Sequence, residues 1–402
     1  MKWKKRLCYL LAAIVIVFLI CITVNVYTSF LLNRELTSIR QQSKPLINAK
    51  IFRREQNAAP LYLRAAAVMH FKRSYNQHNL SKSDVASILR QNTLAIDLIR
   101  KATSKLHCQF TLVRKDVLDI SPQPGLTQMR YLTELLGIQA YHEAQLGNKA
   151  AALQDVRWQY MMACHMASEP FLTWGDNAWS MQNTAHRTLA KILFTISFSS
   201  NQAHEFENSL PEINWTNYLH QILLTERALE ISAIESFRKR SGIKHFLLYQ
   251  ASKMDEVYSL RLWKKIIQTP IPVSSDYMEK MNRRVKEVPF YAFSTQILMP
   301  LYVRTPWVYA YAETKCRERE IVLALAAYHS QYHQYPLTLT PAEKLWQSTF
   351  PLDIYSKKSF RYNSDGKKFV LYSVGANRVD DGGFWKDSGN SAMVKDDIVW
   401  YR

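Results

Sequence analysis

The sequence predicts a mainly α-helical protein with one transmembrane helix at its start and a small α+β module at its end. Three observations support this fold class. The 402 residues include only 10 glycines, and β-rich folds need glycine for their tight turns. Apolar residues recur at spacings of three and four through most of the chain, which is typical of helices with one buried face. Five of the ten glycines follow Pro336, where alternating aromatic and β-branched residues begin.

A basic leader and a long uncharged segment begin the chain. Residues 2–6 contain four Lys and Arg side chains, and residues 7–32 contain no charged residue. At about 1.5 Å per residue, this segment is longer than the roughly 30 Å hydrocarbon core of a bilayer. A cleaved signal peptide has a shorter apolar core of about 7–15 residues and a small-residue exit site, which is missing here. We therefore expect residues 1–33 to form a cytoplasmic leader and a single-pass anchor in the bacterial inner membrane, with the bulk of the chain periplasmic.

The helical region follows a polar stalk. Residues 34–50 are expected to form this stalk, and residues 51–310 an α-helical domain. Gly147 allows the left-handed turn of a helix hairpin, which resembles one tetratricopeptide-like (TPR-like) unit. A regular repeat of about 34 residues does not surround it, so we expect an irregular helical array. Small residues that let the two helices approach closely flank the turn: Ala140, Ala144, Ala151 and Ala152.

Sequence patterns typical of enzymes and metal sites are missing from the chain. The sequence contains no P-loop, no dinucleotide fingerprint and no Gly-x-Ser-x-Gly elbow. His329 and His333 are spaced to share one helical face, but no nearby carboxylate completes a metal site. Beyond the apolar segment, Cys108, Cys164 and Cys316 have no zinc spacing, and one disulfide among them would leave a thiol over. We expect isolated core thiols.

Residues 311–402 are expected to form a small α+β module. A helix opens it, because Ile321, Leu325 and Tyr328 lie on one helical face, and this helix ends before Pro336. The turn sequence Asn-Ser-Asp-Gly then separates two alternating segments, which is typical of a β-hairpin. The strands of this short antiparallel sheet are expected over residues 360–363, 369–373 and 398–401.

A series of short motifs runs through this module. After the helix that ends in Tyr335-Pro336 come Pro351-Leu-Asp353, Arg361-Tyr362, the run Leu-Tyr-Ser-Val-Gly-Ala-Asn over residues 371–377, and Asp396-Asp-Ile398. In this order they resemble the C-terminal region of the major pseudopilin of type II secretion. Pilin precursors also carry a cleavage site and a glutamate inside the apolar helix, and residues 1–32 have neither. The layout of the whole chain is similar to a group of uncharacterised bacterial membrane-anchored helical proteins, and that likeness implies no activity.

The resemblance implies a calcium ion in the loop that follows the second strand. Calcium binds about six to eight oxygen atoms. Asn377 stands where the family usually has an aspartate, which removes one negative charge from the site. The alternative is a loop rich in Asp and Gly whose own side chains cap its turns, without a cation. The candidate ligands are the backbone carbonyl of Val374 and the side chains of Asn377, Asp380, Asp381, Asp396 and Asp397.

The charge balance points to anionic partners. The chain carries 52 Lys and Arg against 33 Asp and Glu, a net charge of +19. Outside the cytoplasm, its anionic partners would be lipid headgroups and polyanionic envelope polymers. No base-reading motif supports binding to nucleic acid, and no motif indicates a small-molecule substrate.

These observations favour a non-enzymatic, membrane-anchored envelope protein that acts as an interaction scaffold. Its partners would be envelope proteins, with a link to a secretion or pilus-like system that the pseudopilin resemblance implies. One alternative is a basic polyanion-binding protein. The other is an envelope hydrolase with a site in the helical domain, formed for example by His186, Glu226 and Glu235.

Overall fold

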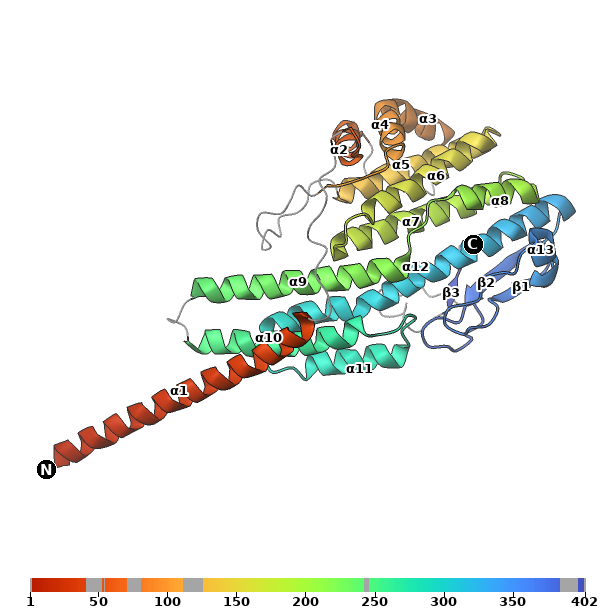
Figure 1. The fold of residues 1–402 in the computed structure, drawn as a ribbon. Coiled ribbons are helices and arrows are strands. Elements are labelled where there is room, and N and C mark those ends of the chain that lie inside the picture. Colours follow the sequence, from red (N-terminus) through yellow and green to blue (C-terminus); the bar gives the residue numbers. More distant parts are fainter. Residues whose placement is uncertain are drawn as a thin grey trace. The chain divides into compact units, whose positions relative to one another are not determined.

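Helices dominate the computed structural model, and the predicted mainly α fold class is confirmed (Figure 1). The chain divides into two compact units, and three of the five boundaries fall within α9, α11 and α12. Unit 1 comprises Met1–Asn48, Leu223–Thr269 and Met278–Arg304, and unit 2 comprises Ala49–Ile222, Pro270–Tyr277 and Thr305–Arg402. The residues that the structure describes are 2–40, 53, 55–70, 81–110, 126–241, 246–383 and 397–400.

This division differs from the expected domains. The helical region over residues 51–310 is shared between the two units, and the C-terminal module belongs to the same unit as the first helices of that region. The reason is that three helices pass from one unit to the other: α9 (Trp215–Ser241), α11 (Ser275–Lys286) and α12 (Phe293–Tyr332).

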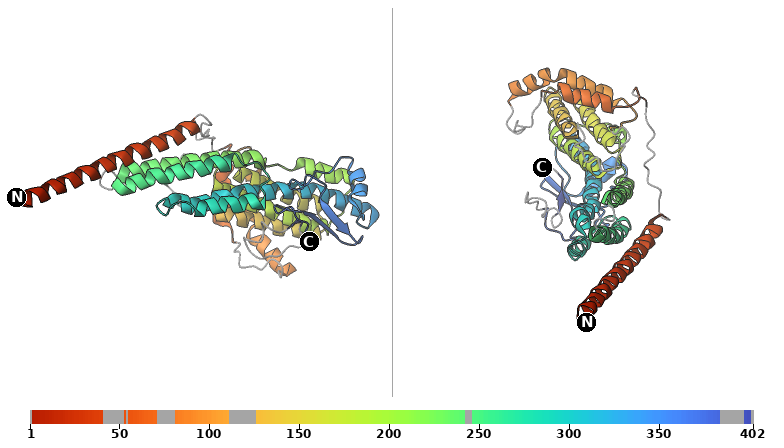
Figure 2. Two further views of the ribbon diagram at one scale, coloured as in Figure 1. Left: turned by 90° about the horizontal axis from the view of Figure 1, so that it is seen from below. Right: turned by 90° about the vertical axis from the view of Figure 1, so that its left-hand side faces the viewer.

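Layered helices form most of unit 2. Helices α5, α6 and α7 pack against one another, while α2 and α4 form a pair that contacts α5 (Figures 1 and 2). The helices that lie wholly in this unit are α2 (Ala59–Val68), α3 (Lys82–Gln91), α4 (Thr93–Thr103), α5 (Leu126–Gln145), α6 (Lys149–Met166), α7 (Leu172–Leu193), α8 (Ser200–Ser209) and α13 (Leu339–Trp346).

The expected helix hairpin is formed by α5 and α6. Gly147 has a φ of +81° in the turn between them, a conformation that costs glycine little. Three of the four expected small contacts, Ala140, Ala144 and Ala152, are buried, whereas Ala151 is exposed. The absence of large side chains at the buried positions lets the two helices pack closely.

The C-terminal sheet packs on the second half of α12. Its strands β1 (Arg361–Ser364), β2 (Phe369–Ser373) and β3 (Ile398–Val399) are antiparallel in the order β1-β2-β3. The predicted hairpin is confirmed, with Gly366 at a φ of +85° in its turn. Leu371 and Trp400 share a hydrophobic cluster with Val322 of α12, so the sheet and the helix form one small core.

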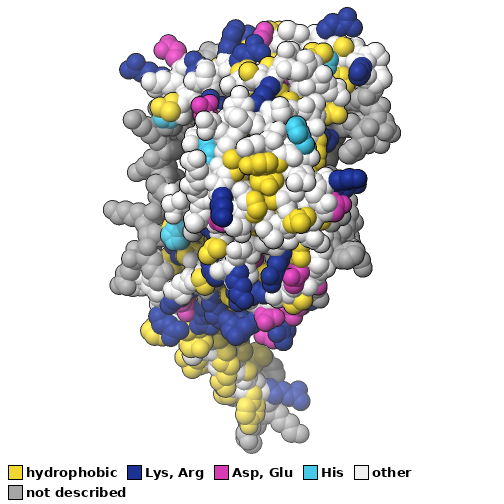
Figure 3. All heavy atoms as spheres, turned by 90° about the vertical axis from the view of Figure 1, so that its right-hand side faces the viewer, with side chains coloured by type: hydrophobic (Ala, Val, Ile, Leu, Met, Phe, Trp, Pro, Cys, Tyr) yellow, Lys and Arg dark blue, Asp and Glu magenta, His cyan; other side chains and the backbone are white. Residues whose placement is uncertain are grey.

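Helix α1 (Lys2–Arg40) and helix α10 (Phe246–Ile267) belong to unit 1. The segment Cys8–Ile39 is long and apolar enough to cross a membrane, and Figure 3 shows its apolar side chains (yellow) uncovered at the foot of the view. The helix continues into the expected stalk as far as Arg40, and the rest of the stalk lies outside the described residues. Side chains near its end, Leu31, Leu32 and Ile39, are buried against Val257 and Leu260 of α10.

A glycine-to-alanine change tests the packing of unit 2. An added Cβ at Gly175 of α7 would lie 1.9 Å from the hydroxyl oxygen of Tyr309, whose ring stacks on Trp215 at 5.1 Å. Overpacking of a core costs about 1–3 kcal/mol, so we expect Gly175→Ala to lower the melting temperature of the detergent-solubilised protein. Gln145→Ala, at an exposed position of α5, is the control and should leave it unchanged. Equal melting temperatures for both variants would contradict this packing.

Candidate functional site

The second half of α12 places three charged side chains in the core of unit 2. Lys315, Glu318 and Arg319 are each at most 1% exposed. The Lys315 ammonium donates hydrogen bonds to the Glu318 carboxylate at 2.9 Å and to the backbone carbonyl of Val399. The Arg319 guanidinium donates to the carboxylate of Glu207 in α8 at 2.9 Å. Both buried cations are therefore paired with a carboxylate, which a buried charge requires.

A histidine and a tyrosine adjoin these charges. The hydroxyl of Tyr160 in α6 lies 2.8 Å from Nδ1 of His186 in α7, and the Arg319 guanidinium lies 5.3 Å from the Tyr160 ring centroid. Burial lowers the pKa of His186 well below its ordinary value, and the positive charges of Arg319 and Lys315 lower it further. His186 is therefore a neutral ring at physiological pH, and it cannot act there as a cationic acid.

Glu318 has the opposite perturbation. Burial raises the pKa of its carboxyl group to about 7, and the ammonium of Lys315 opposes this shift. A carboxyl group that titrates near neutrality is suited to proton transfer, but structural ion pairs show the same shift.

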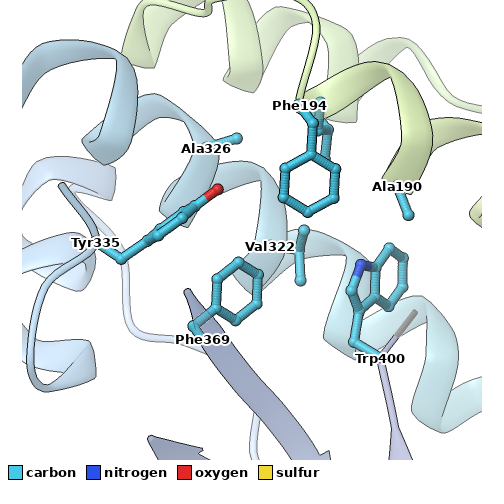
Figure 4. Close-up of a pocket in the computed structure, with 8 residues that line it drawn as sticks. Ala190, Phe194, Val322, Ala326, Tyr335, Phe369 and Trp400 are labelled. Carbon is cyan, nitrogen blue, oxygen red and sulfur yellow. The ribbon is translucent and has the colours of Figure 1, made fainter. Parts of the chain in front are cut away.

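A shallow apolar hollow adjoins the cluster (Figure 4). Tyr335 and Phe369 lie on one side of it, with Phe194 and Trp400 on the other and Val322 between them. The Trp400 ring also packs edge-on against His186, at 5.6 Å between centroids, and 5.7 Å from the Lys315 ammonium. Trp400 thus belongs both to the wall of the hollow and to the charged cluster. The hollow itself presents aromatic and aliphatic groups, which suit an apolar ligand or side chain.

The acidic loop after β2 contains the candidate calcium ligands. Asn377 donates from its side-chain amide to Asp381 at 3.0 Å. Asp380 accepts from the hydroxyl of Tyr372 at 2.9 Å and pairs with Arg361 at 3.0 Å. Two of the candidate carboxylates are therefore already held by groups of the protein, as the self-capped alternative expects.

Asp397 is the candidate ligand that fits a cation best. It is 2% exposed, its Oδ2 accepts from the backbone N–H of Gly383 at 2.8 Å, and within the described residues its Oδ1 has no hydrogen-bond partner. Burial raises the pKa of this carboxyl group to about 6, and the negative charges of Asp381 and Asp380 add to the shift. A divalent cation would supply the positive charge that this buried group needs.

The remaining candidates are not assembled into a complete ligand set. Val374 is buried beside the loop, and Asp396 lies outside the described residues. In the part of the chain that the structure describes, no three His, Cys, Asp or Glu side chains are grouped closely enough to hold a metal ion. His329 stacks on Tyr335 at 4.5 Å, and His333 follows the last residue of α12, so the helical face expected to carry both histidines ends before the second one.

The proposed hydrolase residues fall in different units. Glu226 and Glu235 lie in unit 1, and Glu226 accepts a hydrogen bond from the hydroxyl of Tyr302 at 3.2 Å. His186 lies in unit 2, in the cluster described above.

Sequence reasoning missed the charged cluster on α12. A run of alternating charges on a helix is usually a solvated face, and residues 313–320 have that composition. A signal was present, because Lys315, Glu318 and Arg319 lie on the same helical face as the apolar Val322.

Comparisons with known proteins provide no relative. No protein-family model matches the chain, and no significant match occurs among curated proteins or solved structures.

The buried ion pair of Lys315 and Glu318 in α12 leads to a testable prediction. Lys315→Met leaves the Glu318 carboxylate buried without its cation, which costs about 3–5 kcal/mol, so the melting temperature should fall by several degrees. The double variant Lys315→Met/Glu318→Leu removes both charges and should recover most of the loss. The pKa of Glu318 is raised, so its protonated form favours folding, and the deficit of the single variant should be smaller at about pH 5 than at about pH 8. A single variant as stable as the native protein would rule out this role for the pair.

Proposed function

We propose that this protein is a non-enzymatic, single-pass membrane-anchored envelope protein that acts as an interaction scaffold. The observation that carries the proposal is that the end of α1 is part of the core of unit 1, where Leu31 and Leu32 pack on Val257 and Leu260. A cleaved leader would leave these apolar side chains of α10 uncovered. A retained helix keeps them buried, which favours an anchor over a signal sequence.

The chemistry of α1 supports its place in a membrane. Its large apolar side chains are exposed from Tyr9 to Phe30, for example Phe18 at 63% and Ile20 at 56%. Water is an unfavourable environment for so much apolar surface, whereas lipid is a favourable one. The basic leader favours a cytoplasmic N-terminus, so unit 1 and unit 2 would be periplasmic domains of a protein in the bacterial inner membrane.

The buried polar groups of unit 2 support the scaffold role, because many of them make structural contacts inside the unit. Several titratable side chains in its core bond to one another, as with Tyr160 and His186, or to neighbouring elements, as with Lys315 and the carbonyl of Val399. The apolar hollow offers a contact for a side chain of a partner, and Phe194 at its rim is 67% exposed. The partner class, envelope proteins of a secretion or pilus-like system, comes from the pseudopilin resemblance.

Crosslinking in living cells tests the scaffold. A photo-crosslinking amino acid in place of Phe194 should capture a small set of defined envelope proteins, because this position borders the hollow. The same amino acid in place of Gln145, which is exposed on α5, is the matched control and should capture only background. Identical patterns at both positions, together with a solitary monomer after gentle solubilisation of the membrane, would contradict the scaffold.

We further propose that the acidic loop binds calcium, with Asp397 as its central ligand. The neighbouring side chains of Asn377 and Asp381 would supply further oxygen atoms after their mutual hydrogen bond opens. The buried Oδ1 of Asp397, which has no hydrogen-bond partner within the described residues, is the observation that supports this assignment over the self-capped loop.

Calcium-dependent unfolding tests the site. Without a cation, the raised pKa of Asp397 means that its contribution to stability is present below about pH 4 and is lost as the pH rises through about 6. Calcium favours the ionised form, so the rise in melting temperature with calcium should be larger at about pH 7.5 than at about pH 5. Asp397→Asn should abolish the rise without lowering the melting temperature measured in chelator. No calcium effect on the native protein would leave the self-capped loop as the correct description.

A further inference from the structure

Helices α1 and α10 run parallel to each other at a nearly constant offset. Hydrogen bonds join Asn25 to Gln250 at 2.9 Å, Ser29 to Lys253 at 2.8 Å, and Glu35 to Arg261 at 3.0 Å. The offsets in residue number are 225, 224 and 226, respectively. Two helices of equal rise keep such an offset only if they run in the same direction in register. The depth of any α1 residue in a membrane therefore fixes the depth of its partner in α10.

The apolar segment of α1 sets that depth. Residues 7–26 would fill a hydrocarbon core of about 30 Å, because each residue advances the helix by about 1.5 Å. Asn25 and Ser29, which receive the Lys253 ammonium, then lie at the outer boundary of the core. Lys253 is 6% exposed, and its ammonium bonds only to neutral oxygens in these contacts. The headgroup layer would begin here.

Two other helix ends lie at the same level. The Asp255 carboxylate of α10 accepts from the backbone N–H groups of Ser294 and Thr295 at 2.8 and 3.0 Å, which fixes the start of α12 beside it. Arg238 of α9 pairs with Glu256, the next residue of α10. By the same offset, both contacts lie level with residues 30 and 31 of α1, about 6 Å beyond the hydrocarbon core.

Exposed aromatic side chains gather at this level. Phe293 at the start of α12 is 68% exposed, Phe290 just before it is 87% exposed, and Phe237 beside Arg238 is 51% exposed. Amphipathic elements that lie on a membrane bury such side chains about 5–10 Å into the boundary between headgroups and acyl chains. The last turn of α11, which immediately precedes Phe290 in the chain, adds exposed cations at Arg283 and Lys286.

We propose that this end of unit 1 rests in the outer headgroup layer of the same membrane and binds anionic lipid. The docking surface consists of Phe237, Phe290, Phe293, Arg283 and Lys286. The basic groups attract an anionic surface, and the aromatic rings add apolar burial. This inference rests on the proposed anchor. It implies that α1 and α10 hold unit 1 at a fixed depth in the headgroup layer. A flexible linker between the anchor and unit 1 would not fix that depth.

Spin labels in the full-length protein test the docking. The protein, with its native cysteines replaced, is reconstituted into vesicles of phosphatidylcholine and phosphatidylglycerol and labelled at one new cysteine at a time. The accessibility of the label to oxygen, relative to a water-soluble nickel complex, reports its depth. We expect a severalfold higher ratio for Phe290→Cys than for Leu301→Cys, which is exposed in α12 about two turns beyond its first residue.

A third label position distinguishes a failure of the docking proposal from a failure of the membrane-anchor proposal. Phe18→Cys, in the middle of the apolar segment, should show a high oxygen ratio if α1 crosses the bilayer. A high ratio at Phe18 with equal low ratios at positions 290 and 301 would overturn the docking and leave the anchor intact. Low ratios at all three positions would overturn the anchor itself. Protection of position 290 from both reagents would identify a protein contact between copies, which also overturns the lipid assignment.

Charge reversal tests the lipid chemistry. Arg283→Glu/Lys286→Glu should lower the oxygen ratio at position 290 in anionic vesicles toward its value in pure phosphatidylcholine. Lys367→Glu/Lys368→Glu, at exposed positions of the β-hairpin turn in unit 2, is the matched control and should leave the ratio unchanged. Equal effects of the two double variants, or none from either, would contradict a specific basic surface.

Discussion

The packing of α1 against α10 in unit 1 depends on one buried ammonium group. Lys253 of α10 donates to Asn25 and Ser29 of α1, and burial of a charged group is costly unless its hydrogen bonds are satisfied. This requirement fixes the rotation and register of α1 against α10, and the apolar contacts farther along the pair add stability without adding register. An apolar helix that would otherwise be a tether becomes a structural member of the folded unit.

Unit 2 uses buried charges in a similar way. Lys315 connects α12 to the carbonyl of Val399 in the last strand, and Arg319 connects the same helix to α8. Replacing such pairs by apolar groups is often neutral for stability, so their value lies in specifying which elements meet. The short strand β3, with only two residues, packs where Trp400 covers the Lys315 ammonium and the His186 ring.

The periodicity of the sequence predicted many of the helices and strands, but it did not predict which of them pack together. The uncharged segment of α1, the turn at Gly147 and the β-hairpin at Gly366 depend on local patterns, and all three were predictable. The packing of Leu36 and Ile39 on α10 was not, because apolar residues in a polar stalk do not indicate which distant helix covers them. The division into two units could not be predicted from the sequence for the same reason, since each unit combines segments far apart in the chain. The burial of the Asp397 Oδ1 without a hydrogen-bond partner among the described residues depends on tertiary packing, and composition alone identified only the acidic residues around it.

The measurement that tests the central claim most directly is a thiol crosslink between the two helices. Thr28 and Gln250 are both buried and their side-chain oxygens lie 2.6 Å apart. Because a cysteine at position 250 lacks the reach of the glutamine side chain, a short bifunctional thiol reagent should join cysteines at the two positions in a protein whose native cysteines are replaced. Mass spectrometry after digestion should find the two cysteine-containing peptides joined, whereas a control pair at positions 28 and 264 should carry only separate adducts. Absence of the 28/250 crosslink would show that α1 is not packed into unit 1, and it would contradict the account.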